Sequence, residues 1–181
     1  MLARQIAAGA PYDVFLSADE RRVQELARQE RLEGVTVYAV GRLGLWSKSG
    51  RYRTLADLAS PSLRHLAIAN PAHAPYGAAA REALERSGVW PQVKDRILYG
   101  ENVRQALEYA SSGNAEAAVV AWSLVLDRGG VLVAAELHAP IRQSGGVVNR
   151  SVHKEAAMAF QRFLVSAEGR ALLGRCGFQA P

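Results

Sequence analysis

The sequence predicts an α/β protein, because runs typical of buried strands alternate with segments of helical periodicity along its 181 residues. Two short apolar runs, at residues 66–69 and 97–100, are each followed within a few residues by the start of a helix. The connections between these segments are short. Alternation of this kind indicates helices layered on a largely parallel sheet.

The long β-rich stretch at residues 35–47 contains Gly41 and Gly44, and glycines inside a strand pattern indicate a bend or a bulge. We expect the chain to leave one sheet here and to return to it near residues 138–142. This predicts two lobes, one made of residues 1–44 and 138–181 and the other of the inserted residues 45–137. In such α/β sheets, ligands bind outside the carboxyl ends of the strands.

The other elements are expected from periodicity and from capping residues. The helix at residues 20–29 is expected to have Asp19 as its N-cap, and the last helix to have Ser166. We expect the helix at residues 154–165 to bury an apolar face made of Ala157, Phe160, Phe163 and Leu164. Further helices are expected at residues 2–9, 54–58, 76–87 and 102–112, and further strands at residues 13–16, 115–123, 129–137 and 145–149.

Composition restricts the class of protein. A hydrophobic content of 49% with 22% charged residues is ordinary for a globular protein, and no apolar run approaches the ~20 residues of a membrane span. The first residues have neither the basic start nor the apolar run of a signal peptide. The net charge of +5 comes from arginines scattered over the chain, so we expect no nucleic-acid partner. A single cysteine, Cys176, excludes an internal disulfide and a cysteine metal cluster.

Enzyme motifs are largely absent from the sequence. The four histidines are isolated, so no metal-ligand spacing occurs, and neither a phosphate-binding glycine loop nor a nucleophile elbow is found. Tyr12 with Asp13, and Ser17 with Asp19, resemble a nucleophile and an acid, but no histidine is placed by sequence to act as their base. We interpret them as a strand end and a helix cap, and we predict that the protein is not an enzyme.

Two helix N-termini are the strongest candidates for a binding site. In the segment LAIANPAHAPYGAAAREAL, residues 66–84, no carboxylate lies between Asn70 and Gly77. The segment ILYGENVR, residues 97–104, repeats the arrangement of a strand followed by a helix start. Helix N-termini carry unpaired amides and a partial positive charge, so they bind anions. Because amides and hydroxyls donate hydrogen bonds, a site made of them suits a fully ionised oxyanion, which has only acceptors. His73, in the first loop, is interpreted as a surface residue.

Several motifs, in order along nearly the whole chain, resemble the molybdate-binding proteins of bacterial ABC importers. They are GAPYDVFLSAD, YAVGRLGLWS, NPAHAPYG, YGENVRQALEYASSGNAEAAVVAWS, ELHAPIRQ and the C-terminal EAAMAFQRFLVSAEGRALLGRCGF. The resemblance implies a two-lobed type II solute-binding fold with three-layer α/β lobes. It also implies a monomeric periplasmic protein that captures molybdate or tungstate between its lobes and delivers it to an inner-membrane ABC permease, without a cofactor.

The resemblance also implies which residues bind the oxyanion. Tyr76 and Val103 match the family's contacts from the two helix N-termini. Ala121 stands where many members have a contacting tyrosine, so we expect Tyr76 to supply a hydroxyl as well as its amide. Neighbouring positions that match less specifically are Pro75, Gly77 and Asn102. No residue is expected to bind a metal directly, since molybdenum is held as its oxyanion.

The family pattern begins with a strand, a helix and a second strand that have no counterpart in this sequence. The serine- and threonine-rich oxyanion segments and the signal peptide belong to that region. We therefore interpret the chain as an N-terminally truncated product with an incomplete first lobe, and we expect it to be defective, with weakened binding. The alternatives are the same fold binding another oxyanion such as sulfate, a ligand-sensing regulatory domain, and an enzyme on the same scaffold.

Overall fold

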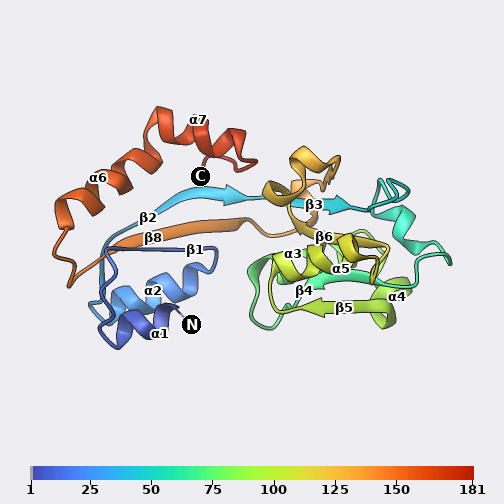
Figure 1. Ribbon diagram of the computed structural model, residues 1–181, viewed down its shortest axis with the longest axis horizontal. Coiled ribbons are helices and arrows are strands. Elements are labelled where there is room, and N and C mark those ends of the chain that lie inside the picture. Colours follow the sequence, from blue (N-terminus) through green and yellow to red (C-terminus); the bar gives the residue numbers. More distant parts are fainter. Residues whose placement is uncertain (1) are drawn as a thin grey trace. The chain divides into compact units, whose positions relative to one another are not determined.

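The computed structural model describes residues 2–181, which divide into two compact units (Figure 1). Unit 1 contains the chain up to Val40 together with Arg142–Pro181, and unit 2 is the continuous segment Gly41–Ile141. Within residues 2–181, no helix is both long enough and apolar enough to cross a membrane.

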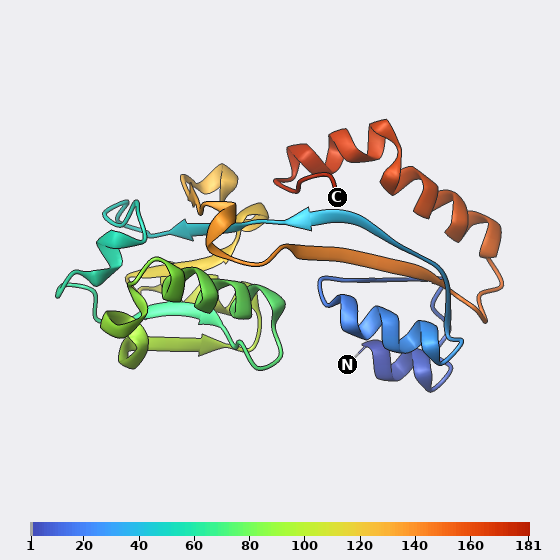
Figure 2. The same cartoon turned by 180° about the vertical axis from the view of Figure 1, so that it is seen from behind.

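Unit 1 is built on a three-stranded sheet in the order β1-β8-β2, with helices on both faces (Figures 1 and 2). Its strands are β1 (Val14–Ser17), β2 (Leu32–Gly41) and β8 (Ile141–Val148). Helices α1 (Leu2–Ala7) and α2 (Glu20–Arg28) pack on one face, while α6 (Lys154–Val165) and α7 (Ala167–Arg175) cover the other. Strands β1 and β8 are antiparallel, so the predicted parallel arrangement is wrong for this pair.

Local capping signals in unit 1 are confirmed. The side chain of Asp19 accepts a hydrogen bond from the amide of Arg21 at the start of α2. The hydroxyl of Ser166 accepts from the amide of Gly169 at the start of α7. Each bond satisfies a backbone donor that the first turn of a helix leaves unpaired.

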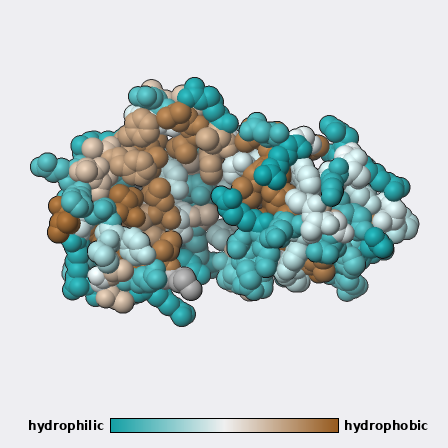
Figure 3. Space-filling view, in the orientation of Figure 1, coloured by the Kyte–Doolittle hydropathy of each residue, from teal (hydrophilic) through white to brown (hydrophobic). Residues whose placement is uncertain are grey.

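The apolar face of α6 differs from the prediction. Ala157 and Leu164 are buried as expected, but Phe160 is 44% exposed and Phe163 is 36% exposed. Their place in the interior is taken by Gln161, whose side-chain amide donates to the carbonyl oxygens of Gly34 and Gly145. Unit 1 accordingly leaves apolar side chains in contact with solvent, and Figure 3 shows hydrophobic residues gathered on its visible face.

Unit 2 is built on a five-stranded mixed sheet in the order β5-β4-β6-β3-β7. Strands β4 (Leu66–Ala69), β5 (Ile97–Gly100) and β6 (Ala117–Ala121) are parallel to one another. Strand β3 (Leu43–Trp46) runs antiparallel to β6 and to β7 (Val131–Leu132). The expected parallel sheet is therefore found only in its β5-β4-β6 half.

The helices of unit 2 follow the parallel strands. Helix α5 (Val103–Ser112) packs through Ala106, Leu107 and Ala110 on the face of the sheet that holds Ala67 of β4. Helix α3 (Pro75–Arg86) contacts β4 and β6 and is followed by the short α4 (Trp90–Val93). Single 3-10 turns occur at Ala56–Ala59, Lys94–Arg96, Trp122–Leu124, Leu126–Arg128 and Ala135–Leu137.

The strand predicted at residues 129–137 is largely wrong. Only Val131–Leu132 pair as β7, and a 3-10 turn follows at Ala135–Leu137. Gly129 has a positive φ of 71°, and the amide of Gly130 donates to the carbonyl of Val125 at 3.0 Å. The chain therefore turns where an extended strand was expected to begin. The strand predicted at residues 115–123 is likewise shorter, because a 3-10 turn starts at Trp122.

Glu116 fixes the entry into β4. Its carboxylate accepts hydrogen bonds from the amides of Arg64 and His65, at 3.0 and 2.7 Å, and from the guanidinium of Arg64 at 3.1 Å. Partial burial acts to raise the pKa of the Glu116 carboxyl, but the hydrogen bonds from His65 and Arg64 outweigh it, so the pKa is lower than usual.

A lowered folded-state pKa predicts how Glu116 contributes to stability. The contribution is complete above the pKa of an unfolded glutamate, about 4.3, and is lost as the pH falls through the lower folded-state value. Glu116→Gln should cost about 1 kcal/mol at pH 7 and less at pH 3, measured by urea unfolding at both pH values. An equal cost at the two pH values would contradict the role of the carboxylate charge. Glu108→Gln on α5, whose side chain is exposed, is the control.

Candidate functional site

The carboxyl ends of β4, β5 and β6 meet at one edge of the unit 2 sheet, which we call the β4–β5–β6 edge. Ala69 is paired with Gly100, so β4 and β5 end at the same level. Ile68 is paired with Val119, which places the end of β6 beside the residues that follow β4. Because the strands are parallel, the loops that enter α3 and α5 start from the same edge.

Helix α3 starts directly above the end of β4. Its N-cap is Ala74, which offers no side-chain cap, and Pro75 has no amide hydrogen. The first turn contains no acidic residue. Gly77 is required by the packing, because a Cβ atom there would lie 2.1 Å from the carbonyl oxygen of Ala69. Tyr76, a predicted site residue, thus lies in the first turn of α3, between Pro75 and Gly77, which packs against β4.

Helix α5 starts in the same way at the end of β5. The side chain of Asn102, its N-cap, accepts from the amides of Arg104 and Gln105 at 2.9 and 3.1 Å. The backbone carbonyl of Asn102 accepts a hydrogen bond from the amide of Ala106. Within residues 2–181, these bonds leave the amide of Val103, the first residue of the helix, without a partner. The first turn of α5 also lacks an acidic residue.

The remaining predicted position, Ala121, is the last residue of β6 and is only 4% exposed. The β4–β5–β6 edge therefore holds all six predicted site residues, on three segments that are separate in sequence. These are Pro75, Tyr76 and Gly77 on α3, Asn102 and Val103 at the start of α5, and Ala121 on β6. Their assignment as oxyanion contacts stays a prediction.

Two hydrogen bonds join the loops that precede α3 and α5. At the strand ends, the amide of Asn70 donates to the carbonyl of Gly100 at 2.8 Å. Farther along the loops, Nε2 of His73 lies 3.2 Å from the carbonyl oxygen of Glu101 and 3.5 Å from its carboxylate. Local sequence patterns do not predict the contact between His73 and Glu101, because the two residues are 28 positions apart.

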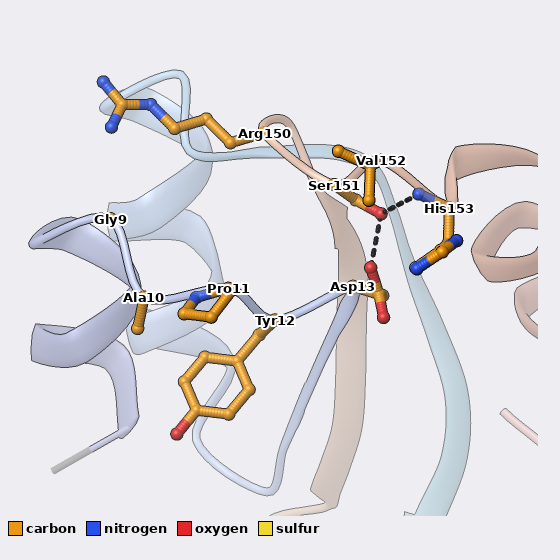
Figure 4. A pocket seen from close by; sticks show the side chains of 9 residues that line it. All are labelled: Gly9, Ala10, Pro11, Tyr12, Asp13, Arg150, Ser151, Val152 and His153. Carbon is orange, nitrogen blue, oxygen red and sulfur yellow. Dashed lines mark hydrogen bonds between the residues drawn. The ribbon is translucent and has the colours of Figure 1, made fainter.

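A separate pocket of about 390 Å³ lies in unit 1 (Figure 4). It is lined by residues 9–13 and 150–153. Ser151 donates to the carboxylate of Asp13 at 2.6 Å and accepts from the backbone amide of His153 at 3.0 Å. Among the residues that the structure describes, no hydrogen bond joins the His153 ring to either side chain. Ser151 thus links β1 to the start of α6.

The family described as bacterial extracellular solute-binding protein matches residues 1–179, and the chain belongs to this family. The molybdate-binding protein ModA of Rhodobacter capsulatus is 35% identical over 184 residues, covering 96% of this chain and 71% of that protein. ModA of Azotobacter vinelandii is also 35% identical, covering 96% of this chain and 73% of that protein.

Solved structures show the same fold. The periplasmic molybdate-binding protein of Azotobacter vinelandii superposes with a TM-score of 0.87 at 29% identity, covering 99% of this chain and 83% of that one. A substrate-binding domain of a molybdenum ABC transporter protein from Clostridium difficile gives a TM-score of 0.78 at 25% identity, with coverages of 99% and 82%. These matches confirm the predicted two-lobed, type II solute-binding class of fold.

Proposed function

We propose that this protein binds molybdate or tungstate and delivers it to an ABC importer. The single observation that carries the proposal is the β4–β5–β6 edge. At this edge α3 and α5 begin side by side, and neither has an acidic residue in its first turn. The chain is also 35% identical to two molybdate-binding proteins. Tyr76 and Val103 are proposed as the main contacts, with Pro75, Gly77 and Asn102 shaping the loops around them.

The chemistry of this edge favours an anion that carries no proton. Helix N-termini supply donors and partial positive charge, and a fully ionised oxyanion offers only acceptors. Ala121 supplies no side-chain hydrogen bond, so the Tyr76 hydroxyl is the side-chain donor that we assign to the ligand. The protein is proposed to act as a monomeric carrier in the periplasm, with a membrane permease as its partner, and to catalyse no reaction.

Oxyanion selectivity tests this proposal. In calorimetric titrations at pH 7, molybdate and tungstate should bind with similar affinity, and phosphate about 10- to 100-fold more weakly. Phosphate retains a proton at this pH, so one of its oxygens is a hydrogen-bond donor. In a site made of amide donors this group finds no acceptor, which costs about 1–3 kcal/mol of binding free energy. Equal affinity for phosphate, or no binding of molybdate or tungstate, would contradict the proposal.

Sulfate is the informative competitor, because it is also fully ionised but smaller than molybdate. A panel in which sulfate displaces bound molybdate only at large excess supports the assignment to molybdate and tungstate. Displacement at equal concentration would instead assign the same site to sulfate. Arg21→Ala, in unit 1, removes a positive charge far from the edge in sequence and serves as a control for nonspecific anion attraction.

A further inference from the structure

We infer that His73 is a positioning residue that fixes the separation of the α3 and α5 N-termini at the β4–β5–β6 edge. The inference rests on the proposed function for its effect on oxyanion binding. The bridge itself is a property of the ligand-free protein. We call the contact between Nε2 of His73 and the carbonyl oxygen of Glu101, at 3.2 Å, the His73 bridge.

Hydrogen bonds to Asn70 hold the first residues of the loop that carries His73 in place. Asn70 holds it in a tight turn, because its side-chain oxygen accepts from the amide of Ala72 at 3.0 Å and its carbonyl accepts from the amide of Ala74 at 2.9 Å. The turn therefore places the imidazole three residues before Tyr76, beyond the strand ends. From this position the ring reaches across to the neighbouring loop.

The acceptor on the other loop is also fixed. The amide of Glu101 donates to the side-chain oxygen of Gln105 at 2.6 Å, and Asn102 caps α5. The carbonyl that receives the His73 bridge thus lies two residues before Val103, on backbone that the helix start holds in place. A displacement of this carbonyl would displace the Val103 amide with it.

The chemistry of the contact fixes the role of the ring. A backbone carbonyl and a carboxylate only accept hydrogen bonds, so Nε2 of His73 must carry a proton and donate. The Asn70–Gly100 bond joins the two loops at the strand ends, and the His73 bridge joins them at the level of the helix starts. Together they hold the two N-termini at one spacing, which is what a ligand contacted by both helices requires.

Substitutions at both ends of the contact test the inference. His73→Ala should speed hydrogen exchange of the ligand-free amides at residues 101–105 several-fold and weaken molybdate affinity about fivefold, the equivalent of one neutral hydrogen bond. His73→Gln, whose amide can donate to the same carbonyl, should restore both. Glu101→Gln keeps the carbonyl and removes the carboxylate charge, so it should leave both measurements near wild type.

The outcomes separate the bridge from the proposed function. If the wild-type protein fails to bind molybdate, the proposed function falls, and the exchange data alone decide the bridge. Unchanged exchange in His73→Ala would overturn the inference. It would equally be overturned if His73→Gln resembled His73→Ala, or if Glu101→Gln weakened binding as much as His73→Ala. The last result would assign the effect to the ion pair with the carboxylate.

Discussion

Gly77→Ala is expected to destabilise unit 2 by about 3 kcal/mol and to abolish measurable oxyanion binding. A Cβ atom at this position would lie 2.1 Å from the carbonyl oxygen and 2.7 Å from the carbonyl carbon of Ala69, and backbone atoms cannot turn aside as a side chain can. Helix α3 would have to move away from β4, which displaces Tyr76 from the edge.

The measurement is thermal unfolding followed by circular dichroism, where a loss of about 3 kcal/mol corresponds to roughly 6–12 °C for a chain of this size. Gly174→Ala, in α7, is the matched control, because among residues 2–181 no heavy atom outside its chain neighbours and the nearby backbone of its own helix lies within 4 Å of a Cβ atom there. It should stabilise the protein by up to about 1 kcal/mol. Unfolding of Gly77→Ala at the wild-type temperature would show that α3 does not need this close approach.

Features encoded locally were the ones that the sequence predicted well. Strands β4 and β5 are short apolar runs followed by turn residues, and Asp19 and Ser166 cap their helices through their own side chains. The placement of the candidate site at strand ends followed from the same signals. Both helix starts are recognisable in sequence, and adjacent parallel strands bring their carboxyl ends to one edge.

Features that depend on distant partners could not be read from local patterns. Apolar residues occur on two faces of α6. The face that is buried is the one that carries Gln161, whose side-chain amide donates to the carbonyls of Gly34 and Gly145, and of these Gly34 lies far away in sequence. The His73 bridge exists because β4 and β5 end at the same level, which the spacing of residues does not determine. Strand β7 is short because only Val131 and Leu132 pair with β3, whose partner residues Leu45 and Gly44 lie far away in sequence.

Val103→Pro is expected to weaken molybdate binding about 10- to 100-fold while leaving the fold intact. Proline is well tolerated as the first residue of a helix, and Asn102 already has the extended backbone, φ −154° and ψ 174°, that precedes a proline. The substitution therefore removes one amide donor and keeps the backbone at the start of α5, and it also replaces the Val103 side chain. A hydrogen bond from an amide to a charged acceptor contributes about 1.5–3 kcal/mol, which sets the expected loss.

Val103→Ala is the matched variant, because it keeps the amide and removes most of the side chain that packs partly against the core of unit 2. Calorimetric titration of the two variants separates the backbone from the side chain. If the alanine variant binds molybdate like the wild type and the proline variant does not, the Val103 amide is a ligand donor. If both bind normally, α5 contributes no contact through Val103, and the proposed site must be drawn around α3 instead. Thermal unfolding of Val103→Pro within about 2 °C of the wild type makes the comparison valid, since a helix start that had melted would lower the transition further.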